Sequence, residues 1–219
     1  MDRLTAGPAM VVEPRSDAPP ASDDLPPRSS RCLGSTAVGA GGCGPRVLVA
    51  FASRHGATRE IAAALAQSLP ASRAGRIGRL STVLAPVELR PDPADFDAVV
   101  LGSAVYAGRW LEPARRYVGA VAPELRGRST WLFSSGLVGD RPGPPDDDPD
   151  GRRIGDWIDA LDHRVFPGRL ERRVLSAAER AGWPAHAVVG DFRDWRAVRA
   201  WCEEIAAEVV TRHAVPVPG

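Results

Sequence analysis

The sequence predicts an α/β fold, a doubly wound three-layer sandwich with a five-stranded parallel sheet. Continuous apolar runs, typical of strands buried on both faces, alternate along the chain with segments of helical period. Strands that alternate with helices imply right-handed crossovers and a parallel sheet. The 219 residues (23.3 kDa) suit one such domain with chain left over.

The first half of the domain supplies three of the expected strands. RVLVAFAS (46–53) is the first strand, and a helix over 58–69 follows it. Glu60 falls in the first turn of that helix, where the helix dipole favours an acid. A weaker second strand is expected around Val87 to Arg90, and FDAVVLGSA (96–104) is the third. The apolar stripes of the two helices in this half are Ile61, Leu65 and Leu69, then Leu111, Tyr117, Val118 and Val121, with Pro113 tolerated in the first turn of the second helix.

The second half supplies the other two strands. STWLFSSG (129–136) is the fourth, and the Pro- and Asp-rich segment 137–151 is expected to be a surface loop. A helix near Arg152 to Leu161 leads to a short fifth strand around Arg164 to Leu170. The last helix begins near Asp191, the expected N-cap, with Asp194 in its first turn. Its buried face consists of Val198, Trp201, Ile205 and Val209.

Composition excludes several classes of protein. All 28 basic residues are Arg and the net charge is only +1, so no nucleic-acid surface is indicated and a phosphate loop that needs a Lys is impossible. Cys32, Cys43 and Cys202 show no metal-ligand spacing, and two of them fall in the N-terminal extension, which favours a reducing compartment. No apolar run approaches the roughly 20 residues of a membrane span. We therefore expect a cytoplasmic protein without a metal.

The two ends of the chain are expected to lie outside the domain, which spans residues 46–213. Residues 1–45 are rich in Pro, Ser, Gly, Ala and Asp and are expected to be disordered, and residues 214–219 form a flexible tail. Residues 39–44 match G-x-G-x-x-G, but they precede the first strand and run into Pro45. Without a strand before it and a helix after it, the match carries no prediction of nucleotide binding.

Three segments at the carboxyl ends of strands are candidates for a ligand site, because ligands of open parallel sheets bind at that edge. The first is Ser53, Arg54, His55, Gly56, Ala57 and Thr58. The N–H groups that open the following helix can bind a phosphate monoester, the two hydroxyls can add donors, and Gly56 permits a close approach of the backbone. The alternative is an ordinary strand-to-helix turn capped by Thr58.

The other two segments suit a flat heterocycle. Tyr106 lies between Gly102 and Gly108, with Trp110 just beyond, and one of these rings can stack on a planar ligand. Alternatively, both aromatic residues simply cover the start of the next helix. SSGLVG (134–139) offers small residues for hydrogen bonds from the backbone, although Ser134 and Ser135 can equally be turn formers.

Four segments together resemble the flavodoxin-domain family, in particular the branch with menaquinone-dependent protoporphyrinogen oxidase, over about residues 46 to 210. They are RVLVAFASRHGATREIAAALA, DFDAVVLGSAVYAGRWLEPARRYV, STWLFSSGLVG and GDFRDWRAVRAWCEEIA. The resemblance implies a flavodoxin-like sheet of strand order 2-1-3-4-5 and one non-covalent FMN. It implies that 53–58 holds the ribityl phosphate. The residues implied to flank the isoalloxazine are Ser103, Ala104, Val105, Tyr106, Ala107 and Gly108, with Ser134, Ser135 and Gly136.

Three functions remain open on the sequence. An FMN-dependent oxidoreductase needs no catalytic side chain, and no acid–base dyad is evident; a porphyrinogen and a quinone are the substrates that the resemblance implies, with residues 166–189 as the variable insertion near them. A flavodoxin-type electron carrier would favour a strongly charged docking face, which the near-neutral composition does not indicate. A binding module without cofactor would be expected to lack Ser53, Gly56 and Thr58, which are all present. A response-regulator receiver is excluded, because its acidic positions hold Ala52-Ser53 and Gly102-Ser103.

Overall fold

A computed structural model of the chain describes residues 44–106, 108–136, 148–170 and 190–214. Five parallel strands form a sheet of order β2-β1-β3-β5-β6, and β4 pairs antiparallel with β3. When the five parallel strands alone are numbered in chain order, this is the predicted order 2-1-3-4-5, so the predicted fold is confirmed. The elements are β1 (Arg46–Ala52), α1 (Ala57–Ala71), α2 (Arg73–Ile77), β2 (Ser81–Pro86), η1 (Val87–Leu89), η2 (Pro93–Asp95), β3 (Ala98–Tyr106), β4 (Arg109–Trp110), α3 (Glu112–Arg126), β5 (Ser129–Ser135), α4 (Pro149–Ile158), β6 (Asp162–Phe166), β7 (Arg169–Leu170), β8 (Gly190–Asp191) and α6 (Trp195–Ala214).

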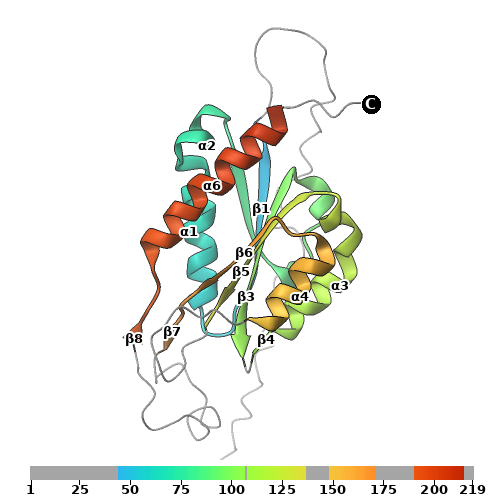
Figure 1. The fold of residues 1–219 in the computed structure, drawn as a ribbon, viewed down its shortest axis with the longest axis vertical. Coiled ribbons are helices and arrows are strands. Elements are labelled where there is room, and N and C mark those ends of the chain that lie inside the picture. The colour runs from blue at the N-terminus through green and yellow to red at the C-terminus, as the bar shows by residue number, and fades with distance from the viewer. Residues whose placement is uncertain (1–43, 107, 137–147, 171–189, 215–219) are drawn as a thin grey trace, which may run out of the picture. The chain divides into compact units, whose positions relative to one another are not determined.

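The helices α1 and α6 cover one face of the sheet and α3 and α4 the other (Figure 1). Successive side chains of β1 lie on opposite faces of the sheet. Val47 and Val49 pack under α1 and α6, whereas Leu48 and Ala50 pack under α3. All four are fully buried, which explains why the strand reads as a continuous apolar run. None of the helices in the described ranges is long and apolar enough to span a membrane.

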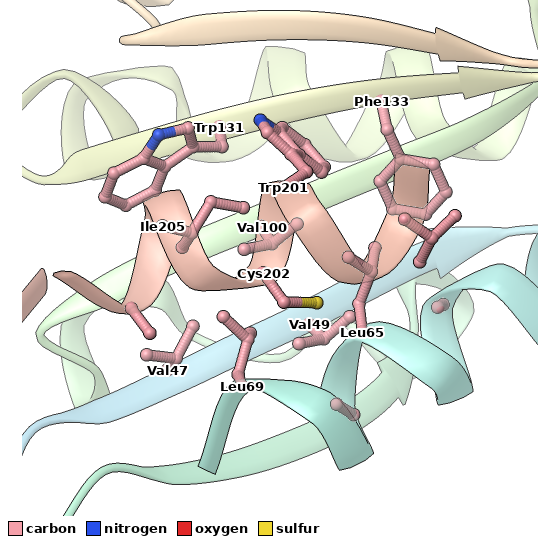
Figure 2. Packing of buried hydrophobic residues seen from close by; sticks show 14 of the residues in the cluster. Val47, Val49, Leu65, Leu69, Val100, Trp131, Phe133, Trp201, Cys202 and Ile205 are labelled. Carbon is pink, nitrogen blue, oxygen red and sulfur yellow. The ribbon is translucent and has the colours of Figure 1, made fainter. Parts of the chain in front are cut away.

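The core under α6 contains the predicted buried face of the last helix. Figure 2 shows Trp201, Cys202 and Ile205 of α6 against strand residues, with Leu65 and Leu69 of α1 alongside. The rings of Phe133, Phe166 and Trp201 pack at tilted or edge-on angles, with centroids 5.7 to 6.5 Å apart. Each fully buried aliphatic side chain contributes roughly 1.5–3 kcal/mol to folding. This cluster therefore fixes α1 and α6 on the sheet.

The opposite face carries a kinked helix. Ala114, Val118 and Leu125 of α3 are fully buried against the sheet, whereas Val121 has non-helical dihedral angles (φ −124°, ψ 20°) two residues before Pro123. The proline ring removes an N–H and crowds the preceding turn, which explains the kink. Val121, expected on the buried stripe, consequently lies only partly buried.

The second strand lies earlier in the chain than expected. β2 spans Ser81–Pro86 and pairs with β1 up to Phe51–Pro86. The residues predicted as strand form a 3-10 turn instead, and it ends at Arg90 in the left-handed region (φ 50°). Pro86 has no N–H with which to extend the ladder, and β1 itself ends at Ala52, so pairing stops there.

Three other elements, β6, β7 and α6, also differ from the prediction. β6 ends at Phe166, because Pro167 cannot continue the ladder, and β7 pairs with β8 rather than with the main sheet. Asp194, rather than the expected Asp191, caps α6, since its carboxylate accepts the N–H groups of Arg196 and Ala197, both at 2.9 Å. The expectations for residues 1–43, for most of the G-x-G-x-x-G match and for 215–219 concern segments outside the described residues.

The segment expected to be a surface loop contains buried acids. Asp148 is fully buried and Asp150 is 7% exposed, and α4 begins between them at Pro149. The Asp148 side chain accepts the Gly151 N–H at 3.0 Å, which makes it the N-cap of α4, and proline is favoured at the position that follows. The prediction of a surface loop is therefore wrong for residues 148–151.

Candidate functional site

The loop between β1 and α1 presents a helix N-terminus without a side-chain cap. Gly56 is the N-cap residue, in the left-handed region (φ 87°) that glycine tolerates best, and its N–H donates to Ser53 Oγ at 3.1 Å. The first intrahelical bond runs from Glu60 N–H to the Gly56 carbonyl at 3.0 Å. The N–H groups of residues 57–59 therefore have no acceptor within the helix. Together with the positive end of the helix dipole, they form a site suited to phosphate.

The structure decides between the two interpretations of Thr58. The N-cap position belongs to Gly56, and Thr58 lies inside the first turn of α1, where it is 2% exposed. The alternative in which Thr58 caps the turn is therefore wrong. Ser53, His55 and Ala57 are half-buried, and Arg54 is exposed.

Two residues of this first loop contact the aromatic ring of the second. The Arg54 guanidinium lies over the Tyr106 ring at 5.5 Å from its centroid, and the His55 ring meets Tyr106 edge-on at 6.1 Å. Tyr106 is half-buried, so part of its ring surface is accessible. The first two predicted loops therefore meet at one edge of the sheet.

The second loop is a tight hairpin. Val105 pairs with Trp110 and Tyr106 with Arg109, and Gly108 in the turn has φ 69°. Ser103 Oγ accepts the Leu111 N–H at 3.0 Å and is fully buried, so its hydroxyl holds the hairpin in place. Ala104 and Val105 are also buried; Ala107 lies outside the described residues. Trp110 is 2% exposed, so its ring cannot stack on a planar ligand, which the sequence had left open.

The third segment lies directly beside the second. A methyl group placed at Gly136, where φ is 120°, would come within 3.3 Å of the Val105 carbonyl oxygen. Ser134 and Ser135 are the last two residues of β5 and not turn formers. Ser135 Oγ is buried and has no hydrogen-bond partner among the described residues. Such a hydroxyl at a strand end is available to a polar group of a ligand.

A buried polar cluster that sequence reasoning missed lies behind the second and third loops. It consists of Trp110, Ser134, Asp148 and His163. Ser134 donates its hydroxyl proton to Asp148 Oδ2 and accepts from Trp110 Nε1 at 2.7 Å. Trp110 Nε1 also donates to Asp148 Oδ2 at 3.0 Å, and His163 Nε2 lies 2.9 Å from Ser134 Oγ. The sequence Asp148-Pro149, a signature of a helix start, was the one local signal for it.

The geometry of this cluster differs from that of a nucleophilic triad. His163 Nε2 faces both the Ser134 hydroxyl and, at 3.6 Å, the Asp148 carboxylate, so the acid does not orient the other ring nitrogen. Ser134 is fully buried as well, out of reach of a substrate. The cluster is therefore a structural element of the site rather than a hydrolytic one.

We expect His163 to make folding stability sensitive to mild acid. Burial lowers the pKa of His163 below its ordinary value of 6.5, although Asp148 and Asp162 act in the opposite direction. The unfolded chain then binds the proton more readily, so this contribution is complete above about pH 6.5 and is lost as pH falls below it. His163→Gln keeps an N–H donor but does not titrate. Urea unfolding between about pH 7.5 and 5.5 should show a smaller loss of stability for this variant than for the wild type; superimposable profiles would contradict the assignment.

Ion pairs link the β7–β8 pair to the first turn of α1. Glu60 accepts from Arg169 at 2.8 Å and from Arg193 at 2.6 Å, and Arg193 also binds Asp191 at 2.5 Å. The hydrogen bond from Arg193 is the main cause of the lowered pKa of Glu60. The two arginines thus balance the charge of Glu60 next to the site suited to an anion.

Comparisons with known proteins give a family and a set of structural neighbours. The family described as "Flavodoxin domain" matches residues 48–182. No curated protein matches. Among solved structures, an archaeal flavodoxin is 13% identical, covers 76% of this chain and 97% of its own, and gives a TM-score of 0.47. Flavodoxin 1 of Bacillus cereus is 14% identical over 76% of this chain and 97% of its own (TM-score 0.44). Rubredoxin oxygen:oxidoreductase of Desulfovibrio gigas is 14% identical over 78% of this chain, but over only 37% of its own length (TM-score 0.49).

Proposed function

The chain belongs to the flavodoxin-domain family, and on this premise we propose that it is an electron-transfer protein that holds FMN at the carboxyl edge of its sheet. Proteins of this family bind FMN, so FMN is its cofactor. The observation that carries the assignment of the site is the uncapped first turn of α1, whose free N–H groups suit the phosphate of the nucleotide.

The residues at this edge fit the cofactor at both of its ends. The N–H groups of residues 57–59 lack acceptors within α1, and a dianionic phosphate would supply them. Leaving a buried hydroxyl such as Ser135 unpaired costs about 1–3 kcal/mol, which a polar group of a bound ring would offset. Tyr106 offers an accessible ring surface on which the isoalloxazine can stack.

We assign the predicted residues to these two tasks. Ser53 to Thr58 hold the phosphate, and the hairpin from Ser103 to Gly108 and the strand end from Ser134 to Gly136 flank the ring. Ser103 and Ser134 act indirectly, because their hydroxyls bond to other groups of the chain. Arg54 and His55, which lie against Tyr106, bring a guanidinium and an imidazole to the first of these segments.

Bound FMN supplies reversible electron transfer at its ring system, so the chain needs no catalytic acid or base. The task of the protein is to bind the nucleotide, to orient the ring and to exclude water from one side of it. Ala104 and Val105, which are almost fully buried, give the hairpin an apolar inner side for this purpose.

The finer function implied by the sequence resemblance is a quinone-coupled oxidation of protoporphyrinogen. Residues 166–189 were expected near such a substrate, and of these 171–189 lie outside the described residues. Reduction of the bound flavin under anaerobic conditions separates the two functions. Reduction by protoporphyrinogen, followed by reoxidation with a quinone, would favour the oxidase; reduction only by a protein donor would favour the carrier.

The proposal predicts that the purified protein is yellow and that denaturation releases FMN in a ratio of about one per chain. The absorbance spectrum and chromatography of the released flavin measure this directly. A colourless protein that takes up no added FMN would contradict the proposal and would favour a binding module without cofactor.

A further inference from the structure

The Asp148 carboxylate joins four separate parts of the fold. Its Oδ1 atom accepts the Gly151 N–H in α4, and its Oδ2 atom accepts from Ser134 at the end of β5 and from the Trp110 indole of β4. His163 of β6 lies 3.6 Å from the same oxygen. β5 and β6 end at the sheet edge assigned to FMN, and β4 pairs with the end of β3 at the same edge. Asp148 is fully buried, so water does not compete for these bonds.

The hydrogen bonds around Ser134 are complete. A serine hydroxyl has one proton and two acceptor positions. The proton is donated to Asp148, and the Trp110 N–H fills one acceptor position. The other faces His163 Nε2 at 2.9 Å, which therefore carries its proton in the neutral ring. Because every position is filled from within the chain, this cluster positions other groups and does not itself bind a ligand.

The group that the cluster positions is the second loop. Figure 1 shows the start of α4 beside β4. The backbone N–H of Trp110 donates to Asp150 at 2.9 Å, so the start of α4 holds both the backbone and the side chain of Trp110. Trp110 pairs in turn with Val105, whose carbonyl oxygen lies against Gly136 of the third segment. Fixing Trp110 therefore fixes Tyr106 and the backbone beside Gly136 together.

We propose that Asp148 is a positioning residue for the flavin: its buried carboxylate holds the Val105–Trp110 hairpin against the end of β5 and thereby pre-forms the ring-binding half of the site. This inference rests on the proposed binding of FMN. A pre-formed site does not lose the free energy needed to order its loops on binding. Removing the hydrogen bonds of the Asp148 carboxylate should therefore weaken FMN binding, even though Asp148 does not touch the flavin.

The variant Asp148→Asn tests this with little effect on the helix. Asparagine is as good an N-cap as aspartate, so the bond from Gly151 is kept. Its amide nitrogen, however, replaces the oxygen that accepts from Trp110, and two donors then face each other. Trp110→Phe is a second variant that keeps a buried ring and removes only the indole donor. Asp156→Asn is the matched control, an exposed acid on the same helix.

The measurements are the FMN dissociation constant and the midpoint potential of the bound flavin, at a temperature where all variants are folded. Both Asp148→Asn and Trp110→Phe should bind FMN about tenfold more weakly, as the loss of a charge-assisted hydrogen bond implies. The potential should shift to a more positive value, because water admitted to the ring solvates the added negative charge better. Asp156→Asn should match the wild type in both.

Val209→Ala, a cavity variant in α6 on the far side of the sheet, controls for general loss of stability. It should lower the free energy of unfolding and leave the FMN dissociation constant and potential unchanged. Wild-type values for both Asp148→Asn and Trp110→Phe would overturn the positioning role, and so would equal effects of Val209→Ala. A wild type that binds no FMN would refute the proposed function itself, before any variant is compared.

Discussion

Replacing Ser53 and Thr58 together by alanine should weaken FMN binding roughly a hundredfold or more, because each hydroxyl bonded to a phosphate dianion contributes about 1.5–3 kcal/mol. Ser53 also accepts the Gly56 N–H, so its removal loosens the turn that presents the helix N-terminus. Calorimetric titration of the full chain with FMN measures the change.

Two controls accompany this double variant. Ser81→Ala with Thr211→Ala removes two exposed hydroxyls far from the loop and should leave the affinity unchanged. Riboflavin, which lacks the phosphate, should bind the double loop variant and the wild type equally. Wild-type affinity of the loop variant for FMN would show that the phosphate lies elsewhere.

Gly102→Ala should strongly destabilise the fold. A methyl group at this position in β3 would come within 2.1 Å of ring atoms of Phe133 on the neighbouring strand. The ring cannot move aside, because Phe166 and Trp201 pack around it. Overpacking of this kind costs about 1–3 kcal/mol, a large part of a typical total stability of about 5–15 kcal/mol.

The matched control for this change is Gly119→Ala. Gly119 lies on the exposed side of α3, and nothing lies within 4 Å of the added methyl group. There the same change should stabilise the protein by about 0.5–1 kcal/mol, since alanine is the better helix former. Urea unfolding compares the two variants. Equal stability of Gly102→Ala and the wild type would show that the packing around Phe133 is looser than described.

The predicted sheet was correct because its strands are apolar on both faces. The runs 46–53, 96–104 and 129–136 need no knowledge of their neighbours to be recognised as buried strands. The edge strand β2 gives a weaker signal, since only one side of it is paired. Five of its six residues are partly buried or exposed, and their burial follows neither the strand period nor the helix period. Its misplacement by several residues follows from that.

The candidate site was predictable where the backbone needs a conformation that glycine adopts most easily. Gly56, Gly108 and Gly136 have positive φ angles, and each lies in a segment that the sequence placed at the ligand edge. The aromatic residues were harder to assign: the residue types alone left both Tyr106 and Trp110 open, the family resemblance implied Tyr106, and the structure buries only Trp110. The burial of the Trp110 side chain depends on its hydrogen bond to Asp148, which is distant in the sequence.

The buried cluster could not be predicted, because its members come from four segments of the chain. Asp148 follows a stretch rich in Pro and Asp that looks like an exposed loop, and charge alone is normally a sign of exposure. Besides the local Gly151 N–H, its partners come from β4, β5 and β6, and tertiary packing brings them together.

The central claim is that the first turn of α1 binds the phosphate of FMN. Titrating the wild-type chain, freed of flavin, with FMN and then with riboflavin tests it most directly. We expect FMN to bind at one site per chain and at least about a hundredfold more tightly than riboflavin. Equal affinity for the two ligands would contradict it.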